Sequence, residues 1–484
     1  MNRQALDRAF NPHCVAVVGD KMATGYVWLR NMSTFTGKLY SVQIDPNELP
    51  GIEELGVKNY RSLLDIPEPV DYVLVAVPRA VAPRIIADCI EKRVGAASLF
   101  TSGFAETHSD EGATLQETLI KMARDASLNL IGPNCMGIFN PKLGVRQDIN
   151  QYHGQSGPIG FISQSGTHAI FFSQVGARHG LLISKSVSYG NGAVLDSEDY
   201  LDYFANDDDT KVIGLYVEGV KDGRKFLDSL RGAARRKPVL VWKGGQGEEG
   251  HRAISSHTGS LASTPVLWDS LVRQSGAIGI DSLDEMIDCM KTILYVNQPQ
   301  GTKVALVAQS GGQSVVLADA FTRAGLTAPL LSQSSYQQFA SFFNTIGGTY
   351  LNPLDTSWHA PSIKDSIRIL DILSTDTNVD SLVAELSLPF LSQIWDFYPP
   401  YLDELVSALA EFKGRCSKAF LVVVSAGQLE EAALNVRNKL MDKGIPSFPN
   451  FDRAAKALAK VAEYHRSQGV QRRSNAPLEN SDGT

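Results

Sequence analysis

Short apolar runs rich in β-branched residues alternate with amphipathic segments along most of this chain. Residues 13–19, HCVAVVG, and 71–77, DYVLVAV, are typical of buried parallel strands. Residues 79–94 and 110–128 instead carry Leu, Ile and Met at helical spacing. Strand and helix in regular alternation predict a parallel sheet covered by helices on both faces. We therefore expect an α/β fold whose first domain, residues 1–140, is Rossmann-like.

The same alternation predicts two more domains, both flavodoxin-like. The first of them spans residues 150–297, and a short polar linker separates it from the second, which spans residues 302–466. Residues 304–321, VALVAQSGGQSVVLADAF, repeat the strand, glycine turn and helix of residues 158–173. The polar residues 467–484 predict a disordered tail.

Composition narrows the class of protein. The chain has 45 Lys and Arg against 52 Asp and Glu, a net charge of −7, which argues against broad nucleic-acid or membrane-surface binding. Its five scattered cysteines favour reduced thiols over a disulfide framework. The first residues form no apolar leader, and no apolar run is as long as a membrane span. We expect a soluble, cytoplasmic protein.

One histidine stands on a glycine-rich segment after the apolar run at residues 238–242. Lys243 and several glycines lead to residues 255–260, SSHTGS, which surround His257. No apolar periodic pattern marks it as a core histidine, so it is open to act as a base, a metal ligand or a nucleophile. No Cys or His pair lies nearby at metal-ligand spacing, so we predict no metal. A nucleophile toward phosphorus is the sharper interpretation, and a solvated loop histidine is the alternative.

A phosphoryl nucleophile needs an anion site and an orienting carboxylate. An apolar strand ends before small residues that open a helix, where backbone N–H groups attract anions: Ser163, Gln164, Ser165, Gly166 and Thr167. The alternative there is an ordinary helix N-cap. Glu218 ends the apolar strand of residues 212–217, at the edge of a parallel sheet that holds ligands. It can accept a hydrogen bond from one imidazole nitrogen, or it is simply a solvated edge residue.

In this order and over this length, SQSGT, YVEG, the glycine-rich loop and SHTGS resemble a known family. It is the CoA-binding subunit of nucleoside-diphosphate-forming acyl-CoA synthetases, which include ADP-forming acetate–CoA ligase and, more distantly, succinyl-CoA synthetase. The similarity extends from about Asn11 to about His465. It implies that His257 is phosphorylated during turnover, that Glu218 steadies it, and that the SQSGT turn holds the phosphoryl group.

The resemblance also implies that the first domain binds coenzyme A through the turns after its strands. The matching positions are Gly19, Lys21, Val77, Pro78, Ser102, Gly103, Phe104 and Asn134. Asp20 departs from the family, because an acidic side chain is unfavourable near a pyrophosphate, although Lys21 can offset it. Cys135 is expected to be a small packed residue. The first turn does not spell G-x-G-x-x-G, so a nicotinamide dinucleotide enzyme is only weakly supported.

Two further polar features lie in the second domain. His168 stands where the family has an apolar residue, and we expect a partly exposed helix histidine there. Residues 207–209, three consecutive aspartates, are expected to form a solvated turn after a helix.

The sequence contains no Walker A motif and no stretch long enough for an ATP-grasp domain. The resemblance therefore implies a separate ATP-grasp subunit that holds ATP or ADP and Mg²⁺, hence a hetero-oligomer in which His257 travels between two sites. We expect an ADP-forming acyl-CoA synthetase subunit that joins a carboxylic acid to CoA. The alternatives are a non-catalytic CoA or acyl-CoA sensor or scaffold, and an NAD-dependent enzyme.

Overall fold

The computed structural model describes residues 1–250, 252 and 265–474. These fall into two compact units, the first made of Met1–Ala177 with Leu181–Leu283 and the second beginning with Arg178–Gly180 and continuing from Asp284. The three domain boundaries inferred above stay predictions. His257 and its SSHTGS motif lie outside the described residues. Within the described part of the chain, no helix combines the length and the apolar character needed to cross a membrane.

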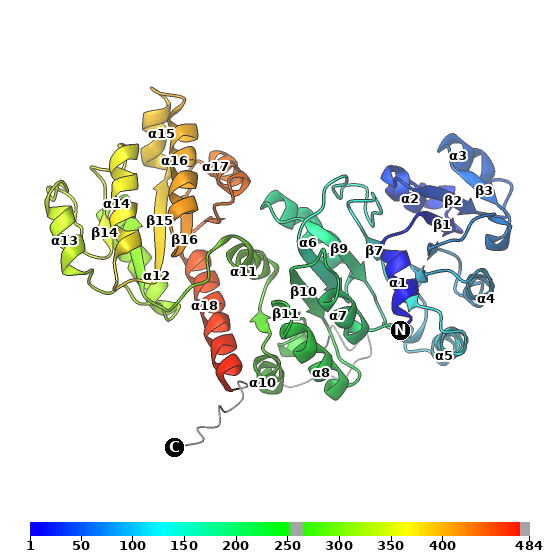
Figure 1. The fold of residues 1–484 in the computed structure, drawn as a ribbon. Coiled ribbons are helices and arrows are strands. Elements are labelled where there is room, and N and C mark those ends of the chain that lie inside the picture. The colour runs from blue at the N-terminus through cyan, green and yellow to red at the C-terminus, as the bar shows by residue number, and fades with distance from the viewer. Residues whose placement is uncertain (251, 253–264, 475–484) are drawn as a thin grey trace, which may run out of the picture. The chain divides into compact units, whose positions relative to one another are not determined.

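The first sheet has six parallel strands in the order β3-β2-β1-β4-β5-β6, as the Rossmann-like prediction requires (Figure 1). Its strands are β1 (Cys14–Val18), β2 (Lys38–Val42), β3 (Lys58–Tyr60), β4 (Tyr72–Val75), β5 (Ala96–Leu99) and β6 (Leu130–Ile131). Its α-helices are α1 (Arg3–Phe10), α2 (Val27–Asn31), α3 (Leu49–Glu54), α4 (Ala82–Lys92) and α5 (Asp110–Asp125), and its short 3₁₀ helices are Met22–Thr24, Met32–Thr34, Leu63–Asp65 and Ala105–Thr107. The sequence did not predict β3, because its three residues are exposed or half-buried and form no apolar run.

The second sheet, also in the first unit, has the order β12-β11-β10-β8-β9-β7. Its strands are β7 (Gly137–Phe139), β8 (Ile159–Ser163), β9 (Ile183–Ser188), β10 (Val212–Val217), β11 (Val239–Lys243) and β12 (Ile278–Ile280). Its helices are α6 (Gly166–Arg178), α7 (Ser197–Ala205), α8 (Gly223–Ala234) and α10 (Pro265–Ser275). Strands β8 to β12 form a flavodoxin-like parallel sheet, and β7 adds an antiparallel partner to β9. The flavodoxin-like prediction is confirmed.

The second unit contains a third, five-stranded parallel sheet in the order β14-β13-β15-β16-β17, again flavodoxin-like. Its strands are β13 (Val304–Ala308), β14 (Leu354–Asp355), β15 (Ser381–Ser387), β16 (Ala419–Ser425) and β17 (Ser447–Phe448). The helices of this part of the chain are α11 (Leu283–Tyr295), α12 (Gly311–Arg323), α13 (Gln333–Ala340), α14 (Ile363–Thr375), α15 (Leu388–Trp395), α16 (Tyr401–Arg415), α17 (Glu430–Asp442) and α18 (Phe451–Ser474). Helix α18 passes residue 467, so the predicted tail overlaps its last turns.

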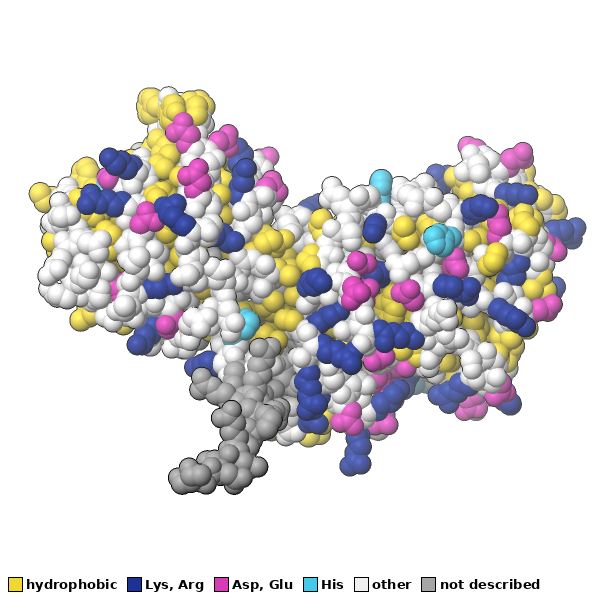
Figure 2. Space-filling model, viewed as in Figure 1, with side chains coloured by type: hydrophobic (Ala, Val, Ile, Leu, Met, Phe, Trp, Pro, Cys, Tyr) yellow, Lys and Arg dark blue, Asp and Glu magenta, His cyan; other side chains and the backbone are white. Residues whose placement is uncertain are grey.

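Hydrophobic side chains gather at one end of α15, where Phe397 is 91% exposed (Figure 2).

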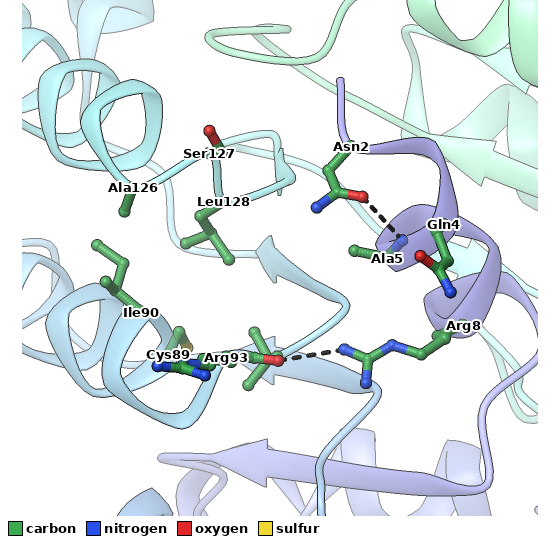
Figure 3. A pocket seen from close by; sticks show the side chains of 11 residues that line it. Asn2, Gln4, Ala5, Arg8, Cys89, Ile90, Arg93, Ala126, Ser127 and Leu128 are labelled. Carbon is green, nitrogen blue, oxygen red and sulfur yellow. Dashed lines mark hydrogen bonds between the residues drawn. The ribbon is translucent and has the colours of Figure 1, made fainter.

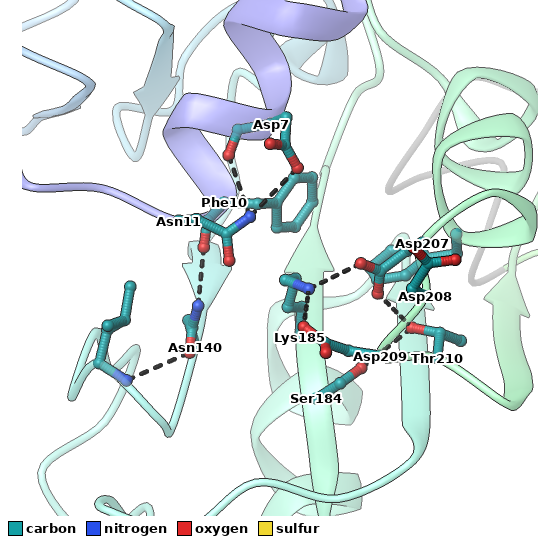
Figure 4. A network of polar contacts seen from close by, with 12 residues as sticks. Asp7, Phe10, Asn11, Asn140, Ser184, Lys185, Asp207, Asp208, Asp209 and Thr210 are labelled. Atoms are coloured by element: carbon teal, nitrogen blue, oxygen red, sulfur yellow. Dashed lines mark hydrogen bonds and ion pairs between the residues drawn. The ribbon is translucent and has the colours of Figure 1, made fainter.

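The three aspartates after α7 only partly form the solvated turn expected from the sequence, because the side chain of Asp207 is buried (Figure 4). Lys185 on β9 is buried, and its Nζ lies 2.7 Å from Asp207 Oδ1 and 2.8 Å from Asp209 Oδ2. Thr210 Oγ1 donates a further hydrogen bond to Asp207 Oδ2. A buried ammonium is costly unless it is paired, so two of the three aspartates neutralise a lysine of the sheet. Asp208 and Asp209 are both exposed, so the expected solvated position is wrong for Asp207 alone.

Candidate active site

The turn after β8 is built from small residues that let two elements approach closely. A Cβ at Gly166 would lie 2.6 Å from Met136 Cγ, so a larger residue there would displace the Met136 side chain. Ser163 Oγ donates to the backbone oxygen of Ser165, and Ser165 Oγ accepts the N–H of His168 at 3.4 Å. The serines therefore shape the start of α6 and cap one of its N–H groups.

Gln164 joins this turn to the end of β10, the neighbouring strand. Its backbone N–H donates to the oxygen of Tyr216 at 3.0 Å. Its side-chain Oε1 accepts the N–H groups of Glu218 at 2.7 Å and Gly219 at 3.1 Å. The structure thus brings the five residues of the SQSGT turn and Glu218 to one carboxyl edge of the sheet. The sequence placed these segments at strand ends but did not identify the amide of Gln164 as the link.

Glu218 is held through its carboxylate from its own strand and through its backbone oxygen from the next one. Tyr216 Oη donates to Glu218 Oε1 at 3.3 Å, and burial together with this carboxylate raises the pKa of Tyr216. Lys243 Nζ donates to the backbone oxygens of Glu218 and Gly244. Burial lowers the pKa of Lys243, against the opposing effect of Glu218. A Cβ at Gly244 would lie 2.6 Å from Tyr216 Oη, so the glycine-rich segment leaves β11 directly beside Glu218.

His168 is part of an aromatic cluster under the same turn. Its ring centroid lies 4.3 Å from that of Tyr216 and 4.6 Å from that of Trp242. Its Nδ1 is buried and makes no hydrogen bond among the described residues, and burial lowers the pKa of the ring. Burial thus favours the neutral imidazole, which packs in the half-buried position expected of a helix histidine.

The residues that the resemblance assigns to CoA follow the carboxyl ends of β1, β4, β5 and β6. Gly19 has a φ of +85°, and a Cβ there would lie 2.5 Å from Val77 Cγ1, so the first turn packs directly on the Val-Pro turn. Gly103 and Asn134 also have positive φ. Lys21, Pro78 and Ser102 are exposed at this edge. Phe104 is fully buried, so it supports its turn and presents no surface to a ligand.

Asp20 does not have the role expected from the sequence. Its Oδ2 accepts the backbone N–H groups of Trp28 and Leu29, both at 2.9 Å, and the residue is 2% exposed. Burial raises the pKa of this carboxyl, although its hydrogen bonds oppose the shift. Asp20 therefore caps the first turn of α2 from inside the protein. Its charge is not presented to a pyrophosphate, and Lys21 is not needed to offset it.

Glu106 is a polar residue of this edge that the sequence interpretation missed. Its Oε1 accepts the N–H of Gly103 at 2.6 Å and that of Phe104 at 3.2 Å, and its Oε2 accepts from Asn191 Nδ2 at 2.6 Å. The signal in the sequence was an acidic residue three positions after the turn glycine, a spacing that suits a side chain bonding back to its own turn.

The cavity shown in Figure 3 lies at the opposite edge of the first sheet. It measures about 620 Å³ and is lined by α1 and by the carboxyl ends of α4 and α5. Arg8 crosses it to donate a hydrogen bond to the backbone oxygen of Arg93. No site residue predicted from the sequence lines this cavity.

Two other kinds of site find no support within the described residues. No group of three or more His, Cys, Asp and Glu side chains is placed to hold a metal ion among them. Cys135 is buried, its Sγ lies 3.5 Å from the backbone oxygen of Leu99, and burial raises its pKa to about 12. A thiol with so high a pKa is a weak nucleophile, so Cys135 is a packing residue, as expected.

Residues 13–141 match the family model of a CoA binding domain, and residues 156–293 match a succinyl-CoA ligase like flavodoxin domain. The chain is 31% identical to the ADP-forming acetate–CoA ligase II subunit alpha of Pyrococcus furiosus over 96% of its own length and 99% of that protein. It is 33% identical to ADP-forming acetate–CoA ligase I of Archaeoglobus fulgidus, and it spans only 65% of that longer protein. The chain also resembles a solved structure of an acetyl-coenzyme A synthetase from Ca. Korarchaeum cryptofilum, in complex with phosphate and ADP. The two superpose with a TM-score of 0.83 at 29% identity, and the match covers 97% of this chain and 99% of that one.

Proposed function

We propose that this chain, which belongs to the family of ADP-forming acetate–CoA ligases, is the CoA-binding subunit of an acyl-CoA synthetase. The enzyme would join a carboxylic acid to CoA while ATP is cleaved to ADP and phosphate. The observation that carries the proposal is the amide of Gln164, which ties the SQSGT turn to the backbone of Glu218. An anion site and a carboxylate thereby lie at one sheet edge, beside the start of the segment that bears His257.

The chemistry follows from what each group can do. One ring nitrogen of His257 accepts a phosphoryl group, while Glu218 accepts a hydrogen bond from the other and keeps the attacking nitrogen unprotonated. The turn of residues 163–167 stabilises negative charge on the phosphoryl oxygens. His257 then passes the phosphoryl group to the carboxylate of the acid, which forms an acyl phosphate. The CoA thiolate attacks the acyl carbon, the C–O bond to phosphate breaks, and inorganic phosphate leaves.

The residues at the edge of the first sheet fit coenzyme A. Gly19 brings the backbone of the first turn against Val77 with no side chain in the way. Lys21, Pro78 and Ser102 are exposed beside it, while the charge of Asp20 is buried in the cap of α2. This arrangement leaves a cationic, open turn for the phosphates of CoA. Asn134 and Gly103 complete the predicted set from neighbouring strand ends.

A partner subunit completes the proposal. The relative from P. furiosus carries the name of an alpha subunit and matches this chain over nearly its whole length, whereas the relative from A. fulgidus is longer. We infer that the partner is an ATP-grasp subunit that holds ATP and Mg²⁺, and that His257 carries phosphate between it and the turn after β8. The glycines that follow β11 suit such movement.

The test is to phosphorylate the chain with γ-labelled ATP and a candidate ATP-grasp partner. Acid-labile label should form on the wild type, disappear in His257→Ala, and persist in His153→Ala, an exposed histidine that serves as the matched control. Glu218→Gln should slow labelling at least tenfold, because an amide is a weaker acceptor for the imidazole N–H.

Label that persists in His257→Ala would contradict the proposed phosphohistidine. CoA binding with no labelling by a competent partner would instead favour a sensor or scaffold without catalysis. Tight NADH binding with no CoA binding would favour the dinucleotide enzyme.

A further inference from the structure

Glu106 links the CoA-binding edge of the first sheet to the second sheet of the same unit. Its carboxylate accepts three hydrogen bonds, from the backbone of Gly103 and Phe104 and from the side chain of Asn191. Three donors converge on two oxygens, an arrangement that an ionised carboxylate satisfies and an amide does not. Burial raises the pKa of Glu106, but the hydrogen bonds from Asn191, Gly103 and Phe104 outweigh it, so the pKa lies below its usual value.

Asn191 is itself held on both sides. Its Nδ2 also donates to Gln116 Oε1 on α5 at 3.0 Å, and its backbone N–H donates to the oxygen of Pro133 at 3.0 Å. Its backbone oxygen accepts from Lys221 Nζ at 2.7 Å. Lys221 follows Glu218 by three residues, and it also pairs with Asp196 at 3.1 Å.

These contacts form one continuous chain of polar groups. It begins at the turn of Gly103, passes through Glu106 and Asn191, and ends at Lys221 on the loop that follows Glu218. We propose that Glu106 is a positioning residue, which through Asn191 holds the CoA-binding turn in register with the Glu218 loop. This inference rests on the proposed function, and it concerns the binding of CoA and not the phosphorylation of His257.

The experiment is a calorimetric titration of CoA into the full chain. In Glu106→Gln one oxygen becomes an NH₂ group that faces the amide of Asn191, and CoA affinity should fall about tenfold, as expected when a charge-assisted hydrogen bond is lost. In Asn191→Asp two carboxylates face each other, and a similar loss is expected. The double variant Glu106→Gln with Asn191→Asp exchanges donor and acceptor, so its affinity should return to within about threefold of the wild type.

Glu117→Gln is the matched control. This glutamate is exposed on the same helix as Gln116, and its variant makes the same change in charge with wild-type CoA affinity expected. Labelling of Glu106→Gln by γ-labelled ATP and the partner should stay within about twofold of the wild type, since Gln164 holds the backbone of Glu218 and Gly219 independently of Lys221. A variant that merely unfolds the protein would lose both CoA binding and labelling.

The outcomes are separable. Unchanged CoA affinity in Glu106→Gln, or a double variant weaker than both single ones, would overturn the positioning role while leaving the proposed function intact. Failure of the wild-type chain to bind CoA would overturn both. If Glu106→Gln unfolds below 37 °C, Asn191→Ala replaces it, with the same tenfold loss expected.

Discussion

The side-chain oxygen of Gln164 lies 2.7 Å from the backbone nitrogen of Glu218, across the pair of neighbouring strands β8 and β10. The same oxygen accepts the N–H of Gly219. One amide thus satisfies two backbone donors where β10 ends, and it sets the direction in which the chain leaves the strand. The position of the carboxylate relative to the SQSGT turn therefore depends on a residue that need not touch the substrate.

Replacing Gln164 by Ala should damage the site more than the fold. It leaves the N–H groups of Glu218 and Gly219 without their acceptor, which costs about 1–3 kcal/mol, and lets the carboxylate move. Labelling of His257 should slow at least tenfold, and calorimetry should show a smaller free energy of unfolding. Gln164→Glu, which keeps an acceptor oxygen, should recover the stability but not the labelling rate, since it adds negative charge beside the phosphoryl site. Equal recovery of both would contradict the electrostatic part of this account.

Replacing Asp20 by Ala should destabilise the first sheet. The carboxylate accepts the N–H groups of Trp28 and Leu29, and loss of a helix cap costs about 0.5–2 kcal/mol. Asp20→Asn keeps one acceptor oxygen, so it should lower the free energy of unfolding by less than Asp20→Ala does. Chemical denaturation of the two variants measures both losses. Asp45→Ala, at an exposed acidic residue after β2, is the control. If Asp20→Ala were as stable as this control, the capping role would be wrong.

Replacing Lys185 by Met should be severely destabilising. The substitution leaves Asp207, whose side chain is 9% exposed, without its cation, and breaking a buried pair from one side costs about 3–5 kcal/mol. Adding Asp207→Asn should recover part of the loss, because the uncompensated charge is removed. Lys211→Met, at an exposed lysine of the same turn, should change the free energy of unfolding by less than about 1 kcal/mol. If Lys185→Met and Lys211→Met lowered the free energy of unfolding equally, the buried Lys185–Asp207 pair would contribute no more to stability than an exposed lysine does.

His179 should make the stability of the second unit depend on pH. Burial, together with the nearby cations Lys291, Arg453 and Arg437, lowers the pKa of His179 from 6.5 to about 4. Because the unfolded chain binds the proton more tightly, the stabilisation is fully present above pH 6.5 and is lost as the pH falls toward 4. The loss should be of the order of 1–3 kcal/mol after allowance for partial exposure.

The measurement is the free energy of unfolding as a function of pH for the wild type and for His179→Gln. The free energy of unfolding of His179→Gln should change less with pH between 6.5 and 4 than that of the wild type. His108→Gln, at an exposed histidine of the first unit, should keep the wild-type slope. A slope that survives in His179→Gln would assign the pH dependence to other groups.

The alternation of apolar runs and amphipathic segments determined the α/β class and the parallel sheets, because side-chain periodicity follows directly from backbone geometry. It also placed the SQSGT turn and Glu218 at strand ends. Strand β3 was not predicted, because its three residues are exposed or half-buried and form no apolar run. The capping role of Asp20 could not be predicted for another reason. An aspartate in a turn gives the same sequence pattern whether its carboxylate faces solvent or caps a helix.

Contacts between residues distant in sequence were decided only by the tertiary structure. Lys185 and Asp207 are 22 positions apart, Gln164 and Glu218 are 54 apart, and Glu106 and Asn191 are 85 apart. No local pattern encodes such partners, because each depends on which strands become neighbours and on which buried donors then lack an acceptor. The sequence by itself determined which chemistry is available at each strand end, and the order of strands in the sheets decided which of those groups meet.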